Sequence, residues 1–126
     1  MKLFTLAAPR ALRTLAPGVA ALVLSSTAFA HAHLMSSEPA ANAQVSAPAE
    51  LTLRFTEPLE PAFSKIALAD AGGSAVAQAA SQVDNTDAKV MHLAVPTLSA
   101  GRYAVHWTAV ATDGHRTQGD FSFNVK

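Results

Sequence analysis

The chain has 126 residues, contains no cysteine, and carries nine basic residues against nine acidic ones. This length accommodates one domain, and the lack of cysteine excludes a disulfide framework, a zinc finger and a cysteine nucleophile. Balanced charge removes the attraction to phosphate on which nucleic-acid binding depends, so we expect no nucleic-acid partner.

Residues 1–30 have the pattern of a secretory signal peptide. All three of their charges are basic, an apolar stretch covers residues 15–24, and the segment ends in Ala28-Phe29-Ala30, the small-x-small pattern of a cleavage site. The apolar stretch is shorter than the roughly 20 residues that cross a bilayer, which argues against a membrane anchor. We therefore expect export through the general secretory pathway, with cleavage after Ala30.

Cleavage at that position leaves residues 31–126 as a single periplasmic domain that is not inserted in the membrane. The mature chain has three more acidic than basic residues, and its first residue is His31.

Apolar residues alternate with polar ones along most of the mature chain, which predicts half-buried strands. The expected strands are residues 51–56, 65–70, 91–95, 103–109 and 121–125. Residues 75–80 could form a turn or a short irregular strand. With about seven short strands in a domain of this size, we expect an all-β, immunoglobulin-like sandwich.

A histidine at the start of the mature chain can bind a metal ion in a particular way. The α-amine and the imidazole Nδ1 of His31 can close a chelate ring on one ion, and two such nitrogens suit Cu(II). A second group of candidate ligands is Thr112-Asp113-Gly114-His115, between the last two expected strands. Asp113 and His115 would complete a set of three nitrogens and one oxygen.

The mature sequence resembles the CopC family of periplasmic copper-binding proteins over essentially its whole length. The matching segments are HAHL at 31–34, SSEPA at 36–40, LTLRFTEPL at 51–59, GRYAVHW at 101–107, DGH at 113–115 and GDFSFNV at 119–125.

The resemblance implies a Greek-key sandwich or barrel of cupredoxin-like or immunoglobulin-like type with one Cu(II) ion per mature chain. In the histidine brace that it implies, the ligands are His31, His115 and Asp113. Glu57 matches an acidic position near the family's copper site, where it would be a weak ligand or hold the amine by a hydrogen bond. The implied partners are an inner-membrane copper transporter of the CopD type or other periplasmic copper proteins.

Some family members have a second site for Cu(I), built from a methionine-rich loop with a histidine. Residues 70–81, the corresponding stretch of this chain, contain neither residue type. Met35 and Met91 are the only methionines of the mature chain, and Met91 belongs to an expected apolar face. We therefore expect a member that binds Cu(II) only.

The other histidines leave alternatives open. His33 is the third mature residue, and a free amine followed by a histidine at that place forms a known type of amino-terminal Cu(II) motif through two deprotonated backbone amides. A folded strand would need those amides for hydrogen bonds, so we favour the brace, with His33 as an auxiliary ligand or an exposed residue. His92 and His106 lie opposite apolar rows, where exposure to solvent is the simpler expectation.

The predicted function is to sequester or deliver copper in copper homeostasis and resistance, by a monomeric carrier that is not an enzyme. The alternative is a copper-dependent oxidative enzyme of the histidine-brace monooxygenase type, which would need an open coordination position. A third possibility is an adhesion-type sandwich that binds no metal.

Overall fold

The computed structural model describes residues 31–76 and 79–126. The predicted signal peptide and two residues of the 75–80 segment lie outside the described residues. Ala75 forms an isolated bridge with Ala69, so the start of that segment lies beside a strand.

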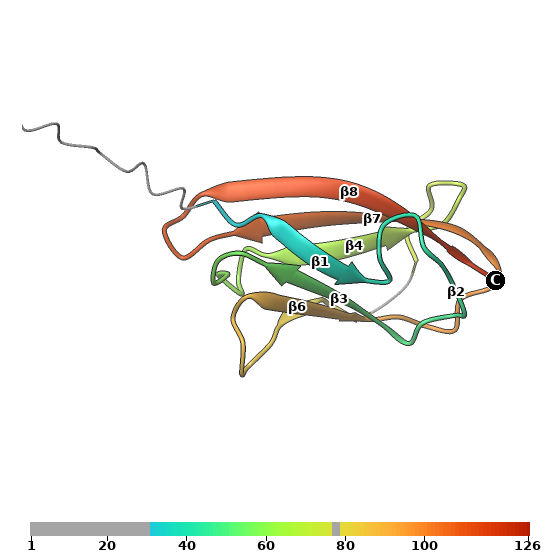
Figure 1. Cartoon of the computed structure of the whole chain (residues 1–126), viewed down its shortest axis with the longest axis horizontal. Coiled ribbons are helices and arrows are strands. Elements are labelled where there is room, and N and C mark those ends of the chain that lie inside the picture. Colours follow the sequence, from blue (N-terminus) through green and yellow to red (C-terminus); the bar gives the residue numbers. More distant parts are fainter. Residues whose placement is uncertain (1–30, 77–78) are drawn as a thin grey trace, which may run out of the picture.

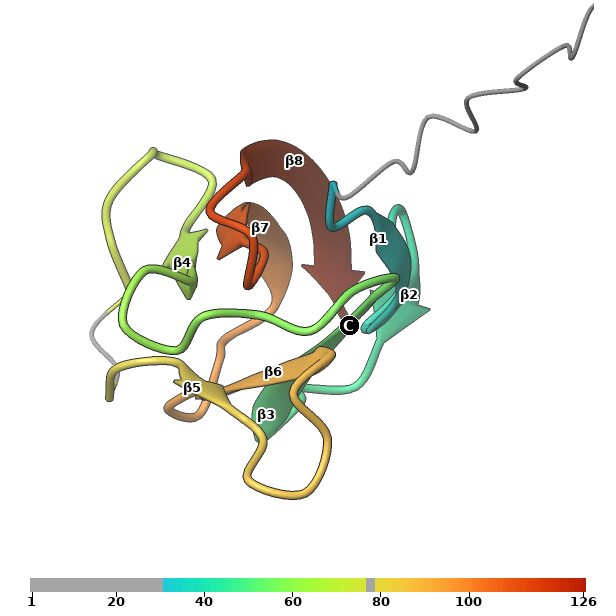
Figure 2. The same cartoon turned by 90° about the vertical axis from the view of Figure 1, so that its left-hand side faces the viewer.

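Two four-stranded sheets pack face to face (Figure 1). The strands are β1 (Leu34–Glu38), β2 (Gln44–Val45), β3 (Glu50–Phe55), β4 (Lys65–Ala69), β5 (Gln82–Val83), β6 (Val90–Ala94), β7 (Gly101–Val110) and β8 (Arg116–Val125). The first sheet has the order β1-β3-β6-β5 and the second the order β2-β8-β7-β4. Every pairing is antiparallel except β2 with β8. Figure 2 looks along the sandwich and shows the two layers.

The predicted all-β sandwich is confirmed, and β3, β4 and β6 lie within one residue of their expected bounds. These strands alternate between buried and exposed side chains, as the sequence pattern required. In the part of the chain that the structure describes, no helix has the length and apolar character needed to cross a membrane.

The described residues form eight strands, where about seven were expected, and two of the eight, β2 and β5, are only two residues long. β8 begins at Arg116, five residues before the expected strand, and continues the pairing of β7 up to Val110. Residues 116–120 have no apolar alternation, so only pairing with β7 makes them a strand. β1 was also missed, since its five residues are half-buried or exposed.

The core lies between the sheets and is closed by aromatic packing. Trp107 on β7 meets Phe55 on β3 edge to face, with ring centroids 5.2 Å apart, so the contact joins the two sheets. Gly119 on β8 lies directly against the indole, because a Cβ there would be 2.5 Å from Trp107 Cζ2. Met91 is fully buried in the same core, as its place on an apolar face predicted.

Candidate metal centre

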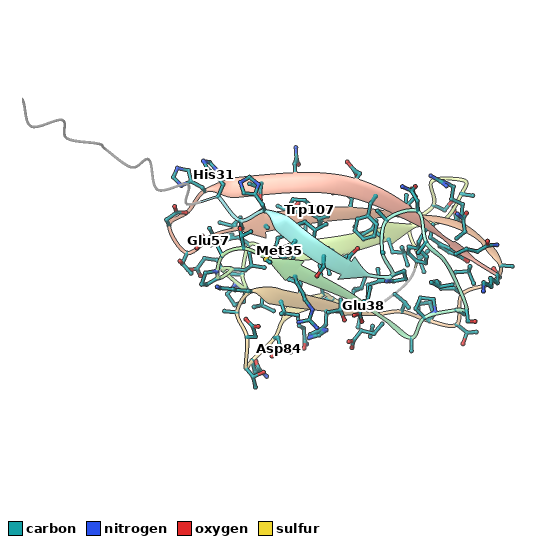
Figure 3. All side chains as sticks on the ribbon, viewed as in Figure 1. His31, Met35, Glu38, Glu57, Asp84 and Trp107 are labelled. Carbon is teal, nitrogen blue, oxygen red and sulfur yellow. The ribbon has the colours of Figure 1, made fainter. Side chains whose placement is uncertain are left out.

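The structure brings His31 and His115 together at one end of the sandwich. His31 precedes β1 and His115 lies in the turn between β7 and β8, yet the centroids of their rings are 4.7 Å apart. His31 is half-buried and His115 is exposed, so solvent reaches both. Figure 3 shows His31 at the rim, with Glu57 at the same end. Two of the predicted ligands are therefore neighbours.

The turn between β7 and β8 is tight and orients its own side chains. The Ala111 carbonyl accepts a hydrogen bond from Gly114 N–H at 2.8 Å, and Ala111 N–H donates to the His115 carbonyl at 3.0 Å. Gly114 has a φ of 91°, which L-residues with a side chain rarely adopt. This backbone turns His115 back toward Asp113.

Asp113 holds His115 through both of its carboxylate oxygens. Asp113 Oδ2 lies 2.8 Å from His115 Nδ1, and Oδ1 accepts a hydrogen bond from His115 N–H at 3.0 Å. These hydrogen bonds, the side-chain one above all, lower the pKa of Asp113. With Nδ1 donating to Asp113, Nε2 of His115 keeps its lone pair for an ion.

Residues 31–33 are tied to both sheets. From the end of β3, Thr56 N–H donates to the His33 carbonyl at 2.9 Å, and the Thr56 hydroxyl accepts from His33 N–H at 2.9 Å. From β8, the Thr117 hydroxyl donates to the Ala32 carbonyl at 2.6 Å. The side chain of Ala32 is completely buried. The first described residues therefore have a defined path even though they precede β1.

Neither threonine was a candidate in the sequence. Thr56 ends an alternating strand pattern in which a polar residue is ordinary, and Thr117 lies in a polar run without a pattern of its own. The contact of each threonine with residues 31–33 depends on how distant strands pair. The sequence carries no local signal for that pairing.

His33 and Glu57 lie near this centre without joining it. The ring centroid of His33 is 6.4 Å from that of His31, and the His33 side chain is exposed. Glu57 is half-buried and follows Thr56, but among the described residues no hydrogen bond links its carboxylate to a histidine.

The donors gathered here are two imidazoles and a carboxylate, a chemistry that suits a borderline cation such as Cu(II). Within the described ranges, no three side chains of histidine, aspartate or glutamate converge closely enough to hold a metal ion by themselves. The predicted cleavage after Ala30 would add the amine of His31 as a further nitrogen donor.

His106 and His92 are engaged elsewhere. His106 is exposed, as expected, and its Nδ1 lies 2.7 Å from Asp120 Oδ1. His92 is half-buried rather than simply exposed. Its Nδ1 lies 3.0 Å from Glu50 Oε1 and its Nε2 lies 2.8 Å from Asp84 Oδ2. Both histidines are thus paired with carboxylates away from His31.

A groove of about 680 Å³ lies beside the β7–β8 turn. It runs over the second sheet, and its lining includes the exposed Phe63, the buried Thr108 and Gly114 of the turn. The side chains of His31 and His115 are not part of its lining, so the histidines form a rim and not the wall of a deep cavity.

Fold and site together define a small β-sandwich protein with a cluster of histidine and carboxylate donors at one exposed end. A CopC domain matches residues 34–126. The chain belongs to the CopC family, a family of copper-handling proteins, and the predicted resemblance is confirmed. Copper resistance protein C of Xanthomonas campestris pv. juglandis is 38% identical over 124 residues, covering 93% of this chain and 97% of the relative.

Solved structures agree in fold. CopC from Methylosinus trichosporium OB3b matches with a TM-score of 0.72 at 31% identity, over 76% of this chain and 94% of that one. PcoC from Escherichia coli, described as a methionine-rich copper resistance protein, matches with a TM-score of 0.69 at 35% identity, over 76% of this chain and 99% of that one.

Proposed function

We propose that this protein is a periplasmic Cu(II) carrier that uses an N-terminal histidine brace to sequester or deliver copper. The observation that carries the proposal is the 4.7 Å approach of the His31 and His115 rings at an exposed end of the sandwich. Membership of a copper-handling family supports copper as the ion.

In this proposal one Cu(II) ion binds per mature chain. His31 supplies its α-amine and Nδ1, His115 supplies Nε2, and Asp113 supplies a carboxylate oxygen. In the structure Asp113 lies on the Nδ1 side of the His115 ring, and Nε2 faces away from it. To bind an ion held by Nε2, Asp113 would therefore release the Nδ1 hydrogen bond and turn one carboxylate oxygen toward the ion. Glu57 takes an outer role at the amine, and His33 remains auxiliary.

The brace is favoured over the amino-terminal amide motif by the hydrogen bond from His33 N–H to Thr56. The amide motif would require that nitrogen as a ligand. His33 N–H is instead committed to the fold, which supports the brace.

A carrier role is favoured over an oxidative enzyme by the surface of the molecule. Among the described aromatic side chains, Phe63 is the large exposed one, while Phe55, Tyr103, Trp107 and Phe123 are buried. The described residues therefore form no flat aromatic surface beside the histidines on which a polymeric substrate could bind. An exposed rim suits transfer of the ion to a partner, for which we propose a CopD-type inner-membrane transporter or another periplasmic copper protein.

The placement of sulfur supports the proposed selectivity for Cu(II) over Cu(I). Met91 is fully buried in the core, and Met35 is 69% exposed on β1. With no methionine or histidine in residues 70–81, the chain lacks the clustered thioethers that Cu(I) prefers.

The test is a competition titration with Cu(II) on protein that begins at His31. We expect His31→Ala and His115→Ala each to weaken binding by more than about 100-fold, since each removes a direct ligand. His106→Ala is the matched control, because it removes an exposed histidine that is also paired with an aspartate. Equal losses in all three variants, or none, would contradict the proposed site.

Export is tested separately. Mass spectrometry of protein recovered from the periplasm should give His31 as its first residue. A different first residue would remove the chelating amine and with it the brace.

A further inference from the structure

We propose that Thr56 determines how Cu(II) binds at the N-terminus, by keeping the His33 amide out of reach of the ion. The inference rests on the proposed Cu(II) function and adds a specificity-determining residue that does not itself bind copper.

Two coordination modes compete for the same terminal residues. In the brace, the ion takes the amine and side chain of His31 and then His115. In the amide motif, the ion takes the amine, the backbone nitrogens of Ala32 and His33, and the imidazole of His33. The sequence HAH satisfies both modes, because His33 is the third residue and Ala32 has a backbone N–H to give up.

Thr56 closes a ring of hydrogen bonds on residues 31–33. Its backbone N–H donates to the His33 carbonyl at 2.9 Å, and its hydroxyl oxygen accepts from His33 N–H at 2.9 Å. The hydroxyl hydrogen is directed to the His31 carbonyl, 3.4 Å away. One side chain thus engages both the amide nitrogen that the competing mode requires and the carbonyl of the first residue.

Other contacts among the described residues also hold residues 31–33 in place, but none of them engages the His33 amide nitrogen that the amide motif requires. Ala32 is completely buried and its carbonyl accepts from the Thr117 hydroxyl at 2.6 Å. These contacts restrain the chain, but they leave the His33 amide nitrogen untouched. Thr56 is therefore the residue whose hydroxyl distinguishes the two modes.

A valine at position 56 has nearly the shape of threonine and lacks the hydroxyl. Thr56→Val leaves the backbone pair with the His33 carbonyl in place and removes only the acceptor of His33 N–H. Thr56→Ser keeps the hydroxyl and serves as the conservative variant. Thr117→Val is the matched control, since it removes a hydroxyl contact to residues 31–33 without releasing an amide N–H.

The experiment loads each variant, beginning at His31, with one equivalent of Cu(II) at a single neutral pH. Electron paramagnetic resonance and the visible absorption band report how many nitrogens surround the ion. The parent protein, Thr56→Ser and Thr117→Val should give a three-nitrogen spectrum. Thr56→Val should give a second, four-nitrogen species with its band at shorter wavelength, and Thr56→Val/His33→Ala should lose that species.

The outcomes separate this inference from the proposed function. If the parent already gives the four-nitrogen species and His33→Ala removes it, the brace itself is wrong. If the parent gives the brace spectrum and Thr56→Val, folded by circular dichroism, gives the same spectrum, only the role of Thr56 is overturned. The same four-nitrogen species in Thr117→Val would also overturn it, because general loosening of the segment would then suffice.

Discussion

Asp113 accepts two hydrogen bonds from His115. Its two oxygens receive the backbone N–H and the ring Nδ1 of His115, which fixes the orientation of that imidazole. A carboxylate in this position raises the basicity of His115 Nε2, and the proposed direct ligation of copper requires that Asp113 turn from Nδ1 toward the ion.

We expect Asp113→Asn to weaken Cu(II) binding by about 10–100-fold and to raise the reduction potential of the bound ion, because a neutral amide stabilises the higher charge less well. Competition titration and voltammetry measure the two effects. Asp120→Asn is the control, since Asp120 pairs with His106 in a similar geometry. A potential unchanged from the parent value would remove Asp113 from the ligands of copper.

Asp84 organises the loop before β6. Its Oδ1 accepts hydrogen bonds from Thr86 N–H and the Thr86 hydroxyl, both at 2.7 Å, and from Asp87 N–H at 3.1 Å. The side-chain and backbone hydrogen bonds from Thr86, followed by the one from His92, hold the pKa of Asp84 well below its ordinary value of 3.8.

Since the folded state favours the ionised form, Asp84 stabilises the fold above its unfolded pKa and loses that contribution as the pH falls through the acid range below about 4. We expect Asp84→Asn to lower the free energy of unfolding at pH 7 and to differ less from the parent near pH 3. Urea unfolding at both pH values measures this. If Asp84→Asn lowered the free energy of unfolding by the same amount at both pH values, the charge of Asp84 would not be the cause.

At the scale of elements, the hairpin of β7 and β8 carries both the turn with His115 and the contact with Trp107. Gly119 allows β8 to approach the indole, and a Cβ would lie 2.5 Å from Trp107 Cζ2. Trp107 also packs on Phe55, which directly precedes Thr56. A shift of the indole would therefore disturb the end of β3, where Thr56 hydrogen-bonds to His33.

We expect Gly119→Ala to destabilise the protein by about 1–3 kcal/mol through overpacking. Gly72→Ala is the control, because its Cβ would meet Asp70 Oδ1 at an ordinary 3.4 Å. Thermal unfolding of the two variants measures the difference. Equal stability of both variants would mean that the indole moves aside without cost.

The strands that the sequence predicted are those whose own side chains alternate, as in β3 and β4. The first half of β8 was not predictable, since residues 116–120 pair with β7 without an apolar row of their own.

Of the candidate site, His31 could be predicted from its place after a cleavage motif, and Asp113 and His115 could be predicted from their place in a turn. Thr56 and Thr117 could not be predicted, because their contacts depend on pairing between residues far apart in the sequence.

At the scale of the whole molecule, the two ends of the sandwich differ. His31 lies at one end, and the C-terminus lies at the other (Figures 1 and 3). In the proposed site, the ion binds at the histidine end and leaves the opposite end free, so an extension after Lys126 should not disturb it. An extension before His31 would convert the proposed chelating amine into an amide.

The proposed brace is tested through the electron paramagnetic resonance spectrum and affinity of Cu(II) in three proteins. One begins at His31, one has a single extra residue before His31, and one has a tag after Lys126. We predict a three-nitrogen spectrum in the first and third proteins, and loss of that spectrum with an affinity at least about 100-fold lower in the second. The same spectrum and affinity in all three would contradict a brace built on the terminal amine.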